Sequence, residues 1–240
     1  MSPDTVQEAR STFEKIELGL PKTKKVTVVI CPSYPHIALF SEYPKRKVVL
    51  GAQNVSLEEK GSFTGEVSMQ MLKDLGVRYL IIGHSERRKL GETDEEINKK
   101  IILALKIGMT PILCVGEQVR DEDGHYLSVI KDQLEKALAG VPKRELEDFV
   151  VAYEPIWAVG AKEALDARGV HEMVLYIKKI FVDLYKLKAV YTAPILYGGS
   201  VDISNASQIL SDGQADGLLI GRQSLDAEHF LEIIRIANTV

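Results

Sequence analysis

The sequence contains little cysteine and lacks a long hydrophobic run. Cys31 and Cys114 are the two cysteines in 240 residues, and each lies in or beside a short apolar segment. So few cysteines argue against a disulfide framework or a metal cluster, and we expect two reduced, buried thiols and no metal site. No apolar stretch approaches the roughly 20 residues that cross a bilayer. The first residues also lack the basic start and apolar centre of a signal peptide, so we predict a cytoplasmic protein without membrane contacts.

The sequence also lacks a large excess of positive or negative charge. The 30 lysines and arginines nearly balance the 34 aspartates and glutamates, and the formal net charge is −4. This balance gives no reason to expect nucleic acid or an anionic membrane as a partner. Linkers and low-complexity stretches are also absent, so we expect residues 1–240 to form one domain.

Short apolar runs alternate with longer amphipathic segments along the chain. Most of the runs lack polar–apolar alternation, which is typical of strands buried on both faces of a parallel sheet. Apolar residues at helical spacing separate them, for example over 95–107, 126–138 and 170–187. This repeated pattern predicts an α/β fold with a parallel sheet. The seven expected strands are 26–30, 48–51, 79–83, 110–115, 149–154, 194–197 and 217–220.

A polar cluster, Gly-His-Ser-Glu-Arg-Arg at 83–88, follows the third of these runs. The carboxyl end of a buried strand is where an α/β protein places its chemistry, and His84 can donate or accept a proton near neutral pH. An alternative interpretation is an ordinary helix start, with Ser85 as the N-cap and Arg87 and Arg88 in solvent.

A carboxylate at a second strand end favours the chemical interpretation. Glu154 closes the fifth apolar run, and Pro155 stops the strand directly after it. The alternative for this residue is a glutamate paired with a nearby cation.

These two segments and four others together resemble the triosephosphate isomerase family, in its order and at nearly its spacings. The resemblance implies a TIM (β/α)8 barrel that interconverts dihydroxyacetone phosphate and glyceraldehyde 3-phosphate in glycolysis and gluconeogenesis. It also implies a homodimer that needs no cofactor. The four other segments are Gly51-Ala52-Gln53-Asn54-Val55, Phe63-Thr64-Gly65-Glu66, Cys114-Val115-Gly116-Glu117 and Tyr197-Gly198-Gly199-Ser200-Val201.

The resemblance assigns roles to the residues at the two strand ends. Glu154 matches the base that moves a proton between adjacent carbons, and His84 matches the neutral electrophile that stabilises the enediolate. The helix start after His84 is expected to lower the pKa of the imidazole. Ser85 matches a residue that holds the base before substrate binds. Glu86 resembles the carboxylate that faces the family's catalytic lysine.

Phosphate binding in the family uses backbone N–H groups, and the matching positions are Gly160, Ser200, Gly221 and Arg222. Arg222 stands where the family usually has a second glycine, and its guanidinium could add a contact, clash or point to solvent. The lid is altered too, because Ala161-Lys162-Glu163 replaces the family's usual Thr-Gly-Lys.

Gln53, Thr64, Gly65 and Glu66 match residues at the dimer interface, where a long loop inserts beside the partner's active site. The alternative for this segment is an ordinary surface loop with a helix N-cap at Thr64.

A closed barrel of this type has eight strands, whereas the sequence shows seven and opens with an expected helix at 6–20. In the family the first strand ends in Asn-x-Lys, and a methionine that commonly follows it aligns with Met1. The resemblance therefore implies that the first strand and the catalytic lysine are missing from these 240 residues. On that ground we expect low or absent isomerase activity. The alternative function is a non-catalytic protein that binds phosphorylated metabolites or a partner protein.

Overall fold

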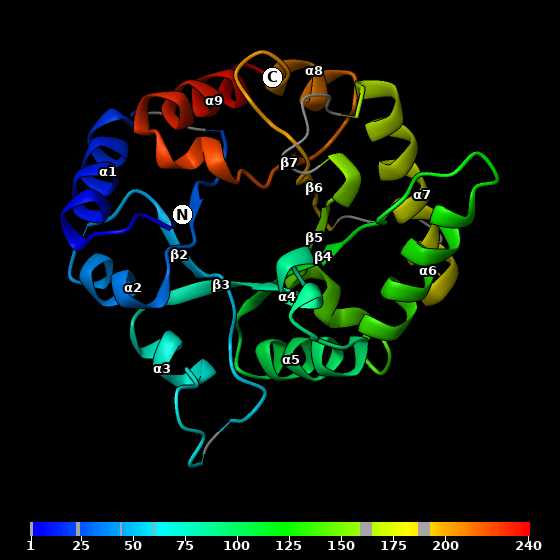
Figure 1. Cartoon of the computed structure of the whole chain (residues 1–240), viewed down its shortest axis with the longest axis horizontal. Helices are drawn as coiled ribbons and strands as arrows, with labels where there is room; N and C mark the ends of the chain where they lie inside the picture. Colours follow the sequence, from blue (N-terminus) through cyan, green and yellow to red (C-terminus); the bar gives the residue numbers. More distant parts are fainter. Residues whose placement is uncertain (1, 23–24, 44, 60, 159–164, 187–192) are drawn as a thin grey trace.

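Parallel strands stand side by side in chain order, and helices surround them (Figure 1). The structure is a computed structural model that describes residues 2–22, 25–43, 45–59, 61–158, 165–186 and 193–240. The described residues contain all seven expected strands, within a few residues of the predicted bounds. They are β1 Val29–Ile30, β2 Val49–Ala52, β3 Val77–Ile82, β4 Thr110–Val115, β5 Val150–Tyr153, β6 Ile195–Tyr197 and β7 Gly217–Leu218.

The predicted helices at 6–20, 95–107, 126–138 and 170–187 are confirmed as α1, α5, α6 and α7. Two of them begin with a capping box, in which Thr5 pairs with Glu8 and Thr93 pairs with Glu96. The α-helices are α1 Val6–Gly19, α2 Tyr34–Ser41, α3 Met69–Asp74, α4 Ser85–Lys89, α5 Asp94–Lys106, α6 His125–Ala137, α7 Ala167–Tyr185, α8 Ala206–Ser211 and α9 Ala227–Thr239, and the 3-10 helices are η1 Lys143–Asp148, η2 Ile156–Ala158 and η3 Arg222–Leu225.

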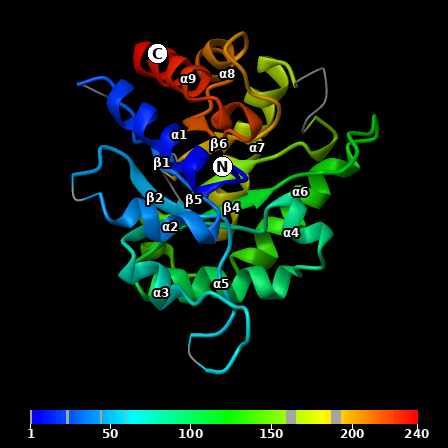
Figure 2. The ribbon, with the colours of Figure 1, turned by 60° about the vertical axis from the view of Figure 1, so that its left-hand side comes forward.

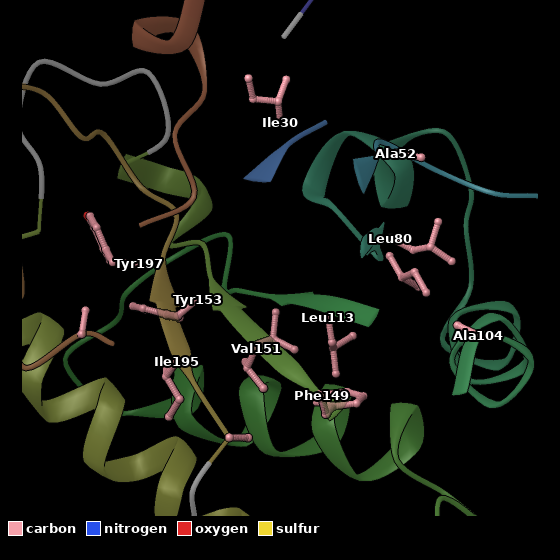
Figure 3. Packing of buried hydrophobic residues seen from close by; sticks show 14 of the residues in the cluster. Ile30, Ala52, Leu80, Ala104, Leu113, Phe149, Val151, Tyr153, Ile195 and Tyr197 are labelled. Atoms are coloured by element: carbon pink, nitrogen blue, oxygen red, sulfur yellow. The ribbon is translucent and has the colours of Figure 1, made fainter. Parts of the chain in front are cut away.

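Both faces of the sheet carry apolar side chains, as the unbroken apolar runs predicted. The outer face packs against the helices, and Figure 3 shows strand residues such as Leu113 and Val151 in this large cluster. The inner face forms a second, smaller cluster that includes Ile112 and Ala152. Successive side chains of a strand point to opposite faces, so neighbouring residues of β4 and β5 serve different clusters.

The two edges of the sheet are β1 and β7, and each is two residues long. In the described part of the chain, no backbone ladder joins β7 to β1. The sheet is therefore a curled, open α/β barrel. None of the described helices has both the length and the apolar character that crossing a membrane requires.

A buried lysine ties the end of β2 to the start of α5. The ammonium group of Lys100 donates to Oδ1 of Asn54 at 2.8 Å and also contacts the carboxylate of Glu92. Lys100 is 4% exposed. Beyond Asn54, the chain that leads to α3 extends away from the ring of helices in both views (Figures 1 and 2).

Candidate active site

The carboxyl ends of the strands meet at one end of the curled sheet, because all of the strands are parallel. His84 follows β3, Gly116 follows β4, Glu154 follows β5 and Gly198 follows β6. This arrangement brings groups from four chain segments to one place.

Glu154 and His84 are in direct contact at this place. Oε1 of Glu154 lies 3.1 Å from Nε2 of His84, and Oε2 accepts a hydrogen bond from the backbone N–H of Ser85 at 3.3 Å. Glu154 is 2% exposed. Glu86 points away, because its side chain is 82% exposed and its nearest ionic contact is Nδ1 of His84 at 3.8 Å.

The alternative interpretation of 83–88 as a plain helix start is wrong in two details. The N-cap of α4 is His84 and not Ser85, since Nδ1 of His84 accepts from the N–H of Glu86 at 3.2 Å. Arg88 is not in solvent, because it donates to the carbonyl of Gly83 and to Asp94. The helix start is therefore built from the same residues as the site.

The pKa of His84 lies above its ordinary value in this arrangement. Burial lowers the pKa. The hydrogen bond and charge of Glu154, with the charges of Glu86 and Glu92, raise it by a larger amount. The expectation of a lowered pKa is therefore wrong while Glu154 touches the imidazole. The N–H that Nδ1 accepts assigns the proton of the neutral ring to Nε2, which faces Glu154.

Two glycines make room for Glu154. A Cβ on Gly116 would lie 1.8 Å from the carbonyl oxygen of Glu154, and a Cβ on Gly198 would lie 2.8 Å from its Cγ. The side chain of Gln133 holds the peptide of Gly116 from α6, since it accepts from the N–H at 2.9 Å and donates to the carbonyl at 3.1 Å. These close approaches explain why both positions lack a side chain.

A second buried carboxylate, which the sequence interpretation missed, lies beside the base. Oε1 of Glu117 accepts from the hydroxyl of Tyr153 at 2.9 Å and from the indole N–H of Trp157 at 2.8 Å. Burial raises the pKa of Tyr153, and the nearby charge of Glu117 adds to the rise. Glu117 and Ser85 also line a cavity of about 390 Å³ between α4 and α6. The signal in the sequence was the carboxylate that directly follows Gly116.

The two cysteines line the inner face of the sheet and are not joined by a disulfide. Burial raises the pKa of the Cys31 thiol to about 12. Burial also raises the pKa of Cys114, and the charge of Glu154 raises it further. Among the described residues, no group of three histidine, cysteine, aspartate or glutamate side chains is placed to hold a metal ion.

Comparison of the sequence with known proteins finds one family over nearly the whole chain. A family model described as triosephosphate isomerase matches residues 2–237. The triosephosphate isomerase of Alkaliphilus oremlandii (strain OhILAs) is 41% identical over 234 residues, which are 95% of this chain and 93% of that protein. The chain belongs to the triosephosphate isomerase family. An α/β barrel and an isomerase activity follow from this membership.

The positions that match the family's phosphate site lie at neighbouring strand ends. Ser200 follows β6 and Gly221 follows β7, and these two strands pair in parallel. Gly221 precedes η3, where the side chain of Arg222 is exposed. The start of α9 is not open to an anion, because the carboxylate of Asp226 already accepts from two of its N–H groups. Gly160 lies outside the described residues.

The triosephosphate isomerase lid falls mostly outside the described residues, including Ala161, Lys162 and Glu163. Its two flanks are described. Trp157 stands on one flank in contact with Glu117, and the N–H of Leu165 on the other flank donates to the hydroxyl of Tyr197 at 3.3 Å. Burial raises the pKa of Tyr197 to about 12.

The residues that match the family's dimer loop lie on the outside of this chain. Thr64, Gly65 and Glu66 are exposed, and Gly65 has a φ of +88° in a turn that the N–H of Glu66 closes on Phe63. The predicted alternative of a helix N-cap at Thr64 is wrong, since Ser68 caps α3. Gln53 lies elsewhere, at the strand ends, where it donates to the carbonyl of Cys31 at 3.0 Å.

Proposed function

We propose that this chain interconverts dihydroxyacetone phosphate and glyceraldehyde 3-phosphate, with Glu154 as the base and His84 as the electrophile. One observation carries the proposal. A carboxylate that is 2% exposed lies 3.1 Å from Nε2 of an imidazole, where the ends of β5 and β3 meet. A positioned base contributes on the order of 10²–10⁴-fold to the rate.

The contact between these two groups describes the site before substrate binds. Substrate places its two reacting carbons between them, so that Glu154 removes a proton from one carbon and returns it to the next. Nε2–H of His84 then donates to the oxygen that gains charge, because Nδ1 is occupied by the N–H of Glu86. The hydroxyl proton of the neighbouring carbon moves to this oxygen, so that a carbonyl forms on one carbon as a hydroxyl forms on the other. Once Glu154 turns to the substrate, its hydrogen bond to His84 is lost, and one of the causes that raise the pKa of the imidazole is removed. This change favours the neutral ring that the family assignment requires.

Backbone N–H groups around Ser200, Gly221 and Arg222 are proposed to bind the substrate phosphate, together with Gly160. Gly221 supports this role because no atom lies within 4 Å of where its Cβ would be, so an anion can approach the backbone. No cofactor or metal takes part in this scheme.

A homodimer in the cytoplasm is proposed as the working form. Thr64, Gly65 and Glu66 lie on a loop that extends from the body, which suits insertion into a partner (Figure 2). Gln53 lies at the strand ends, where the loop of a partner subunit would insert.

Slow turnover is expected of this chain. In the described part of the chain, no lysine forms an ion pair or hydrogen bond with Glu154, His84 or Glu86. A cation near the developing negative charge commonly contributes on the order of 10²–10³-fold. Turnover typical of the family would show that another cation, such as Arg222, takes the place of the lysine.

The experiment is a coupled assay with glyceraldehyde 3-phosphate, on the parent chain and on the variants Glu154→Ala and His84→Ala. We expect measurable turnover in the parent and a loss of at least about 10²-fold in each variant. Arg144→Gln is the control, because this side chain is 82% exposed and pairs with its neighbour Glu145. Turnover in Glu154→Ala equal to that of the parent would remove Glu154 from the mechanism. A parent without any turnover would reject the proposed reaction for these residues.

A further inference from the structure

The turn that carries Glu154 is held on both sides by one residue. Oε1 of Glu117 accepts from the hydroxyl of Tyr153, which precedes the base, and from the indole of Trp157, which follows it. The carbonyl of Glu117 also accepts from the backbone N–H of Ile156 at 2.9 Å. Three hydrogen bonds to Glu117 therefore fix the chain around Glu154.

An arginine, Arg120, forms an ion pair with this carboxylate. Nη1 of Arg120 lies 3.9 Å from Oε1 of Glu117 and 3.4 Å from the hydroxyl of Tyr153. Nη2 donates to Glu172 of α7 at 3.2 Å, and the guanidinium lies 4.4 Å from the centre of the Tyr126 ring. Arg120 therefore joins the loop after β4 to α6 and α7, and its side chain is 19% exposed.

The buried position of Glu117 makes this arginine necessary. Glu117 is 1% exposed, and its Oε2 has no hydrogen-bond partner within the described residues. A buried carboxylate without a nearby cation is unfavourable, because ionised groups are costly to remove from water, and its side chain is expected to turn toward solvent. Arg120 is the cation that forms an ion pair with Glu117 in the described structure. A displaced Glu117 side chain would weaken the bonds to Tyr153 and Trp157.

We propose that Arg120 is a positioning residue for the base: it holds the Glu117 carboxylate in place, and Glu117 holds the turn that carries Glu154. Arg120 itself makes no contact with Glu154 in the described structure, so its effect passes through Glu117. The inference rests on the proposed function, since it concerns the placement of the proposed base. Glu172 and Tyr126 support this role, because their contacts with the guanidinium hold it within ion-pair distance of Glu117.

Trp157 provides a direct readout, because it is the single tryptophan of the chain and its indole N–H donates to Glu117. We compare its emission spectrum and acrylamide quenching in the parent, Arg120→Gln and Arg120→Lys, without substrate. Arg120→Gln is expected to change both properties, and Arg120→Lys is expected to restore part of the parent signal. Arg144→Gln, an exposed arginine outside the site, is the matched control and should leave the signal unchanged.

Steady-state kinetics supply the second readout. A misplaced base lowers kcat more than it raises KM, and a shift of about 1 Å can cost on the order of 10²-fold. We expect kcat to fall about ten- to a hundredfold in Arg120→Gln, with partial recovery in Arg120→Lys. Glu172 is the exposed partner of Arg120 on α7. Glu172→Gln should change Trp157 emission and kcat in the same direction as Arg120→Gln, but by a smaller amount.

Two results would overturn the inference. The first is parent-like Trp157 emission in both Arg120→Gln and Glu172→Gln. The second is a lower melting temperature in Arg120→Gln with kcat unchanged, which would make the arginine merely structural. If Arg120→Gln does not fold, Arg120→Lys and Glu172→Gln decide by the same two readouts. If the parent shows no turnover, the proposed reaction fails, while the emission of Trp157 still decides whether Arg120 positions this turn.

Discussion

Oε1 of Glu154 and Nε2 of His84 lie 3.1 Å apart, and they join the ends of two strands that are not neighbours in the sheet. Between them in the sheet lies β4, whose end carries Gly116 and Glu117. Three strands therefore position the pair, and a substitution at the end of any of the three is expected to displace the Glu154 carboxylate.

Glu154→Gln should lower the pKa of His84, because it removes the charge and the accepting carboxylate that raise it. The imidazole signals in an NMR titration measure this pKa. Glu86→Gln should lower it less, since that carboxylate is mostly in solvent. An unchanged pKa in Glu154→Gln would contradict the prediction.

The same pair should make stability depend on pH in a defined direction. The folded pKa of His84 lies above its unfolded value of about 6.5, so the folded chain binds more protons. The stabilisation is fully present below the unfolded pKa and is lost as pH rises through the folded pKa. The melting temperature of the parent should therefore exceed that of Glu154→Gln by more at about pH 6 than at about pH 9.

Gly198→Ala should reduce activity without unfolding the chain. The added Cβ would lie 2.8 Å from Cγ of Glu154, so the flexible carboxylate side chain moves. We expect kcat to fall about tenfold or more, with a cost of about 1–3 kcal/mol in the free energy of unfolding. Kinetics and chemical denaturation measure the two effects. Gly221→Ala is the control for stability alone, because nothing lies within 4 Å of that position. Parent-like kcat in Gly198→Ala would show that the base tolerates the displacement.

Lys100→Met should destabilise the fold strongly, because it leaves the carboxylate of Glu92 buried without its cation. Removal of one partner of a buried pair typically costs about 3–5 kcal/mol. Urea denaturation measures the change, and the double variant Lys100→Met with Glu92→Leu should recover part of it. Lys179→Met, from an exposed pair with Asp183, should have little effect. Equal stability of the two single variants would contradict the role of the buried pair.

Inorganic phosphate should bind weakly near Ser200 and Gly221, and Arg222→Gly should bind it less tightly. The exposed guanidinium of Arg222 can turn to an anion at this strand end, which is worth up to about fivefold in affinity. Calorimetry, or NMR shifts of the Gly221 amide, measures the dissociation constant. Tighter binding in Arg222→Gly would show that the arginine obstructs the site instead.

The sequence predicted the bounds of a strand best where the strand has a neighbouring strand on both sides. The bounds of β4 agree with the predicted 110–115, because an unbroken apolar run is paired with a strand on each side. The expected strands at 26–30 and 217–220 are only two residues long in the structure. They form the two edges, where the ladder has a partner on one side, and hydropathy alone does not show where such a ladder ends.

The sequence predicted only those residues of the candidate site that directly follow a strand. Glu154 and His84 each follow an apolar run, so their strand positions bring them together. The role of Glu117 was not visible, because its partners come from residues 36 and 40 positions later in the chain. Arg120 is more distant still from its partner Glu172, with 52 positions between them. Such contacts depend on how helices and loops pack, which no local pattern in the sequence records.

The order of the strands in the sheet is also their order in the chain, from β1 to β7. Each strand pairs with the one made just before it, so every pairing closes a loop of only one strand–helix unit. Loop closure costs grow slowly with length, and domains begin to fold from the amino terminus during synthesis. The sheet can therefore grow in one direction as the chain leaves the ribosome, with the newest strand as the growing edge. On this route the ends of β3, β4 and β5 come together before β6 and β7 are made.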